Sequence, residues 1–148
     1  MSTTQSLQVL LDRETDERDG LLAALQQAQM RAQAARAQTE QLIAYRDDYH
    51  RRWSGQFRTQ ATMDILRCYQ DFSQRLEEAI AQQTRVATHA ETQVQRAREA
   101  LTAQEIRVAS VRKLIERRIA EQQRAAERRD QKQTDEAAQR AAWRPTPA

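Results

Sequence analysis

Proline and glycine are nearly absent from this chain of 148 residues. Both prolines, Pro145 and Pro147, stand at the C-terminal end, and the two glycines are Gly20 and Gly55. Inside a helix proline costs about 3 kcal/mol and glycine about 1 kcal/mol, so these residues mark the places where helices end. The sequence therefore predicts very long helices, one interruption around Ser54 and Gly55, and a stop at Pro145.

Large apolar side chains are also scarce. Aromatic residues make up 5% of the chain, and the 39% of hydrophobic residues include many alanines, so an ordinary globular core cannot be filled. Cys68 is the single cysteine, which excludes an internal disulfide. Apolar runs long enough for a signal peptide or a membrane span are missing as well. We therefore expect a cytoplasmic protein whose burial follows narrow helical seams.

Two heptad series indicate where those seams lie. The first runs through Leu7, Glu14, Leu21, Ala28, Ala35, Leu42 and Tyr49, accompanied by Leu11, Arg18, Leu25, Ala32, Thr39, Arg46 and Trp53. The second, which is more apolar, runs through Leu66, Ser73, Ile80, Ala87, Val94, Leu101, Val108 and Ile115, accompanied by Tyr69, Leu76, Gln83, Ala90, Ala97, Gln104 and Val111. Such series are typical of coiled coils.

A short connection between two heptad-bearing helices favours antiparallel neighbours. We predict an all-α fold, an antiparallel two-helix coiled-coil hairpin that forms a single domain over residues 1–148. Helix 1 is expected over about 4–54, the bend over about 55–61, helix 2 over about 62–142 and a tail over 143–148, with Thr59 or Thr62 capping helix 2. The helices would span roughly 75 Å and roughly 120 Å, so the longer second helix overhangs at the C-terminus.

Charge is distributed unevenly along the chain, whose net charge is +3. Residues 112–144 hold ten basic and six acidic residues, whereas residues 1–20 hold two basic and five acidic ones. The basic end could follow nucleic-acid phosphates, but its interleaved acids break the positive field, and residues 112–142 contain no aromatic residue that could stack on bases. A protein partner suits this pattern better. Gly20 marks either a local bend or a tolerated surface position.

Six of the seven aromatic residues gather around the expected bend. They are Tyr45, Tyr49, Trp53, Phe57, Tyr69 and Phe72, and we interpret most of them as a plug that closes the hairpin. Phe72 and Ala79 lie to one side of the second seam, and Leu76 connects them to it, so these three residues are predicted to form an exposed apolar strip. Strips of this kind usually bind a partner.

Catalytic and metal-binding patterns are missing. His50 and His89 stand on different helices without a second ligand nearby, and no base is positioned to activate Cys68. Two helices with two glycines offer neither a phosphate-binding loop nor a carboxylate cleft. We therefore expect no enzymatic activity, no metal and no cofactor.

Three segments carry a resemblance to a known family. They are Asp130–Arg144 (DQKQTDEAAQRAAWR), Tyr45–Tyr49 (YRDDY) and Tyr69–Phe72 (YQDF) leading to Leu76–Ile80 (LEEAI). Together they resemble FliJ, the small coiled-coil component of the flagellar type III export apparatus that serves motility. The similarity extends over essentially the whole chain.

The resemblance implies a stalk similar to that of rotary ATPases, monomeric when free, cytoplasmic and peripherally associated with the inner-membrane export apparatus. Its implied partners are the hexameric export ATPase FliI, the export-gate protein FlhA and export chaperones. The implied gate contact is Phe72, Leu76, Ala79 and Gln83, where the family commonly has histidine at the last position. The implied ring contact is Asp130, Lys132, Asp135, Glu136 and Arg140. A stalk of a virulence secretion system, a homodimeric structural coiled coil and a nucleic-acid adaptor are the alternatives.

Overall fold

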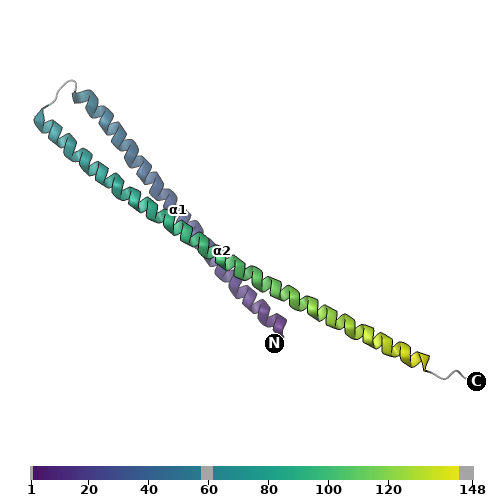
Figure 1. Ribbon diagram of the computed structural model, residues 1–148. Coiled ribbons are helices and arrows are strands. Elements are labelled where there is room, and N and C mark those ends of the chain that lie inside the picture. The colour runs from purple at the N-terminus through teal and green to yellow at the C-terminus, as the bar shows by residue number, and fades with distance from the viewer. Residues whose placement is uncertain (1, 58–61, 144–148) are drawn as a thin grey trace, which may run out of the picture. The chain divides into compact units, whose positions relative to one another are not determined.

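Two long helices make up almost all of the described chain (Figure 1). The computed structural model describes residues 2–57 and 62–143. Helix α1 spans Thr3–Phe57 and helix α2 spans Met63–Ala142, with 55 and 80 residues respectively. The two helices pack against each other as a hairpin whose second helix is the longer one. The predicted all-α hairpin is therefore confirmed.

Side-chain caps define where both helices begin. The amide of Gln5 donates to the hydroxyl of Ser2 (3.2 Å), and the amide of Ser2 donates to the side-chain oxygen of Gln5 (3.0 Å), which together form a capping box for α1. The amide of Ile65 donates to the hydroxyl of Thr62 over 3.3 Å and caps α2. Thr62 is thus confirmed as a cap, whereas Thr59 lies outside the described residues.

The end of α1 differs from the prediction. The helix continues through Ser54 and Gly55 to Phe57, so the break predicted after residue 54 is wrong by three residues. The Ser54 hydroxyl donates to the carbonyl of His50 (2.8 Å), and Gly55 has no positive φ. A single helical glycine costs only about 1 kcal/mol, which is too little to stop a helix at this point. The C-terminal boundary of α2 falls at Ala142, as predicted.

Burial along both helices follows the heptad series. All predicted seam positions, from Leu7 to Trp53 and from Leu66 to Ile115, are buried or half-buried. The most buried side chains still keep some exposure, for example 2% for Val108 and 8% for Leu25. This is the shallow burial expected when only two helices share a core. The seam interpretation is therefore confirmed for both helices.

The chain divides into two compact units, and both helices contribute to each. The hairpin unit is Asp19–Ala103 and the terminal unit is Met1–Arg18 with Gln104–Ala148. In the hairpin unit, Leu25 and Ala32 of α1 form a core cluster with Val94 and Leu101 of α2. The half-buried residues that pack around this cluster are Leu21, Ala28, Ala90 and Ala97.

In the terminal unit a buried polar side chain joins the helices. Gln104 is 3% exposed, and its amide donates to the carbonyl of Glu14 (2.9 Å) and to the Glu14 carboxylate. Farther along, Gln122 donates to the hydroxyl of Thr4 over 3.2 Å, close to the start of α1. In these two contacts the residue number falls along α1, from Glu14 to Thr4, while it rises along α2, from Gln104 to Gln122. The two helices are therefore antiparallel. Residues 126–142 of α2 and the following Trp143 are all exposed.

Gly20 lies within α1 and is exposed, which agrees with the second of the two alternatives, a tolerated surface position. A Cβ added at Gly20 would meet nothing within 4 Å. Gly20→Ala is therefore expected to raise the free energy of unfolding by about 1 kcal/mol, because alanine restricts the unfolded chain and favours the helix. Chemical denaturation followed by circular dichroism measures this change. A loss of stability would show that the helix at Gly20 needs the freedom of glycine.

Candidate functional site

Five aromatic rings of the hairpin unit contact one another. Tyr49 is at the centre, with ring-centroid distances of 5.7 Å to Tyr69, 4.6 Å to Phe72 and 5.9 Å to Trp53. Tyr45 meets Phe72 edge-on at 6.4 Å. Because these rings come from both helices, the cluster holds α1 and α2 together near their connection, as the plug interpretation predicts. The side chain of Phe57, the sixth residue of the predicted group, lies outside the described part.

The electrostatics of this cluster reflect its packing. Desolvation by the surrounding rings raises the pKa of Tyr49, and the neighbouring Tyr45 and Tyr69 add to this effect. Next to the cluster, Arg46 donates to Asp47 (3.2 Å) and to Glu77 of α2 (3.3 Å). The hydrogen bond to Asp47 and the charges of both carboxylates raise the pKa of Arg46. Arg46 therefore stays protonated and adds a polar link between the helices.

The predicted apolar strip is only partly exposed. Phe72 is 37% exposed and Ala79 is exposed, but Leu76 is 7% exposed, so the prediction that Leu76 belongs to an open surface is wrong. Leu76 lies four residues before the buried Ile80 and follows the seam of α2 instead. What α2 leaves open here is the partly covered ring of Phe72 and the methyl group of Ala79.

Gln83, the predicted polar edge of this strip, contacts α1. Its side-chain amide donates to the carbonyl of Ala35 over 3.4 Å and to the side-chain oxygen of Gln38 over 3.1 Å. Gln83 is half-buried and occupies a seam position. Its amide nitrogen therefore serves the hairpin, and only the exposed part of the side chain is available to a partner.

Groups suited to catalysis are dispersed in the described structure. No three His, Cys, Asp or Glu side chains among residues 2–57 and 62–143 gather in a way that could hold a metal ion. The ring of His50 faces Tyr69 at 5.7 Å, His89 lies 3.4 Å from the amide of Gln93, and Cys68 is exposed. In the same described part, neither helix contains a stretch apolar and long enough to cross a membrane.

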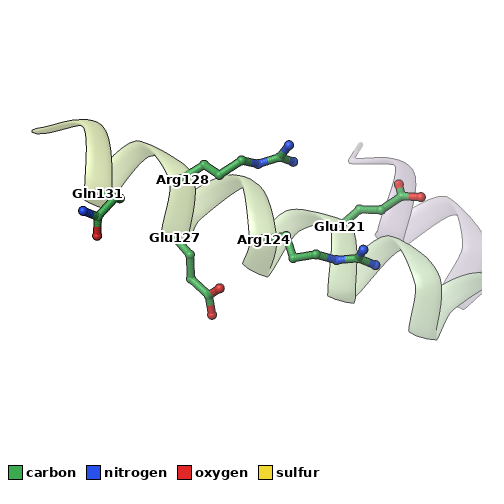
Figure 2. Close-up of a pocket in the computed structure, with 5 residues that line it drawn as sticks. All are labelled: Glu121, Arg124, Glu127, Arg128 and Gln131. Atoms are coloured by element: carbon green, nitrogen blue, oxygen red, sulfur yellow. The ribbon is translucent and has the colours of Figure 1, made fainter.

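The C-terminal part of α2 presents acidic and basic side chains side by side. Figure 2 shows four of them, together with the neutral Gln131, projecting from one stretch of the helix, where the five residues line a shallow pocket: Glu121, Arg124, Glu127, Arg128 and Gln131. All five are exposed, and all come from α2. A shallow, open pocket lined by one helix alone cannot enclose a small molecule. Its charged side chains are instead suited to a protein surface of mixed charge.

The five predicted ring-contact residues continue this surface. Asp130, Lys132, Asp135, Glu136 and Arg140 are all exposed on α2. The side chain of Gln131 donates to Asp135 (3.1 Å), and the hydroxyl of Thr134 donates to the carbonyl of Asp130 (2.9 Å). These local bonds leave most donors and acceptors of the segment facing water. The structure thus places the five predicted residues on one exposed stretch of α2.

The fold defines a class: a two-helix coiled-coil protein, here with exposed charged side chains along the end of its second helix. The family model for the flagellar FliJ protein matches residues 3–146, and the chain belongs to this family. The resemblance seen in the sequence is therefore confirmed, and the chain is a component of the flagellar protein-export apparatus. Searches of curated proteins and of solved structures found no match.

Proposed function

We propose that this chain is the non-enzymatic stalk that couples the hexameric export ATPase FliI to the export gate FlhA. In this proposal the chain works in the cytoplasm, monomeric when free, and reaches the inner membrane only through its partners. It also assists the delivery of export chaperones with their substrates. Membership of the FliJ family supports a place in the flagellar export apparatus. The exposed face around Phe72 and Ala79 supports a gate contact, and the charged end of α2 supports a separate ring contact.

The observation that carries the proposal is the open end of α2. Among the described residues of the terminal unit, the hydrogen bond between Gln122 and Thr4 is the one farthest along α2 that joins it to α1. From residue 126 to Trp143 every side chain is exposed, although the helix continues to Ala142. A helical segment without a neighbour gains no packing energy, and in proteins most helical stability comes from such packing. A binding partner for this segment would supply the missing stabilisation.

The ring contact is assigned to Asp130, Lys132, Asp135, Glu136 and Arg140. These side chains are three acids and two bases. Exposed ion pairs formed by such groups with a partner confer specificity and faster association more than affinity. The gate contact is assigned to Phe72, Leu76, Ala79 and Gln83. Phe72 and Ala79 would touch FlhA, whereas Leu76 would support Phe72 from the seam.

Hydrolysis of ATP by FliI, measured with and without the full chain, tests the proposal. We expect several-fold faster hydrolysis at equimolar chain and no hydrolysis by the chain alone, because the stalk would promote ring assembly without chemistry of its own. An unchanged rate together with a lack of association in sedimentation would contradict the ring contact.

Specific observations bear on the alternatives. Membership of a flagellar family favours the flagellar apparatus over a virulence secretion system. The hairpin already pairs both heptad seams within one chain, which removes the need for a homodimeric structural coiled coil. Acidic side chains such as Glu121 and Glu127 stand among the arginines of α2, which disfavours a nucleic-acid adaptor.

A further inference from the structure

A second surface of the hairpin unit is not used by the ring or gate contacts. A groove of about 690 Å³ lies between α1 and α2, and both helices contribute to its walls. Five alanines form much of its lining: Ala24, Ala28 and Ala35 from α1, and Ala90 and Ala97 from α2. Val86, which is 48% exposed, adds a larger apolar side chain. Apolar surface of this size on a two-helix protein is open to water unless something covers it.

The dimensions of the groove match a helix. From Ala24 to Ala35 its lining covers three helical turns of α1, or roughly 16 Å at 1.5 Å per residue. Small side chains along such a length let a third backbone approach closely, which larger residues would prevent. A third helix laid along the groove would complete a three-helix arrangement, with its own apolar residues at i, i+3, i+4 and i+7.

Charge determines which helix fits. Arg31 and Arg96 line the groove together with His89, and no acidic residue lines it. Neither arginine forms an ion pair with any described residue of the chain. The other side of the same unit differs, because there Arg36 pairs with Glu91 beside Arg98. An acidic side chain of the chain itself therefore compensates basic charge on that side, whereas no acidic residue lines the alanine groove.

We propose that the alanine groove binds an acidic amphipathic helix of a partner protein. The alanines and Val86 would receive the apolar face of this helix, and Arg31 and Arg96 would pair with carboxylates on its flanks. Nucleic acid fits less well, because the groove offers no aromatic ring for base stacking and its floor is apolar. This surface is separate from the residues assigned to ring and gate, so its failure would leave those contacts untouched.

Two synthetic helical peptides test the proposal with the full chain. Both carry leucine and alanine at i, i+3, i+4 and i+7 over four turns, but one has glutamate and the other lysine at the flanking positions. Fluorescence anisotropy gives both affinities for the unchanged chain. The glutamate peptide is expected to bind at least about tenfold more tightly, since two ion pairs become two repulsions in the lysine peptide.

A matched pair of charge reversals locates the binding site. The double variant Arg31→Glu/Arg96→Glu is expected to bind the glutamate peptide about tenfold more weakly than the unchanged chain does. The double variant Arg85→Glu/Arg98→Glu should bind this peptide with an affinity that differs by less than about twofold. Both double variants lower the net charge equally and alter exposed positions outside the seam. Thermal melts of both establish that the hairpin persists.

Three outcomes would overturn the proposal. The first is equal affinity of the two peptides for the unchanged chain, and the second is an equal loss in the two double variants. The third is tight binding of a short single-stranded RNA that only the Arg31 and Arg96 reversal abolishes, because the groove would then be a nucleic-acid surface.

Discussion

Ala79→Glu is expected to abolish binding of the chain to FlhA while its thermal unfolding stays unchanged. Ala79 is exposed on α2, so a longer side chain finds room in the free protein. In an apolar contact beside Phe72, however, the new carboxylate would be buried without a partner. That burial costs about 3 kcal/mol or more, which corresponds to a loss of roughly a hundredfold in affinity. Isothermal calorimetry with FlhA measures the affinity, and circular dichroism measures the unfolding.

Ala81→Glu is the matched control. Ala79 and Ala81 are both exposed and flank the buried Ile80 in the sequence. Each is rotated by about 100° from Ile80 around the helix axis, in opposite directions. The same substitution at Ala81 therefore adds the same charge to the same turn but on the other face. If both variants bind FlhA as tightly as the unchanged chain, this face of α2 is not the gate contact.

Direct removal of the strip would be a poorer test, because two of its residues also stabilise the hairpin. Leu76 is buried, and its replacement by alanine costs about 2 to 5 kcal/mol. Phe72 lies 4.6 Å from the ring of Tyr49, so its truncation also weakens the aromatic cluster. A lost interaction with FlhA could then reflect unfolding. Ala79 avoids this ambiguity because only its methyl group takes part.

A chain that ends at Ala120 is expected to lose its stimulation of FliI entirely and to keep its binding to FlhA. The truncation removes all five proposed ring-contact residues and the hydrogen bond between Gln122 and Thr4. It leaves residues 72–83 and the core cluster around Leu25 and Val94 in place. Hydrolysis assays with FliI and calorimetry with FlhA measure the two activities on the same preparation.

A chain that ends at Ala142 is the control for this truncation, since it retains all of α2. We expect it to stimulate FliI as the full chain does. If the chain that ends at Ala120 stimulates FliI equally well, residues 121–142 do not contact the ring. If it loses both activities while its melting temperature holds, the proposed division between ring and gate contacts is wrong.

Much of the fold could be predicted because it depends on local preferences. Thr62 caps α2 through a bond to Ile65, three residues away, and the heptads place each seam residue at a fixed angle around its own helix. The end of α1 was harder to predict. Gly55 weakens a helix by about 1 kcal/mol, and whether that loss ends the helix depends on its surroundings.

The candidate surfaces were less predictable than the fold. The exposure of the charged residues around Asp130 and Arg140 could be predicted, because no large aliphatic residue follows Ile119 that would pack against α1. The position of Leu76 could not, because Leu76 belongs to a heptad series and also adjoins Phe72 and Ala79. Only the position of α1 decides which of these neighbours it joins, and the hairpin buries it at 7% exposure.

The sequence by itself determined that the chain is two long helices with matching seams, because helix breakers, caps and heptads act over at most a few residues each. Only the tertiary structure decided which side chains those seams leave open. In the folded hairpin, the side chain of Gln83 donates to the carbonyl of Ala35, and Arg31 and Arg96 line the exposed alanine groove. These results depend on pairing residues far apart in the chain, and the register of that pairing is a property of both helices together.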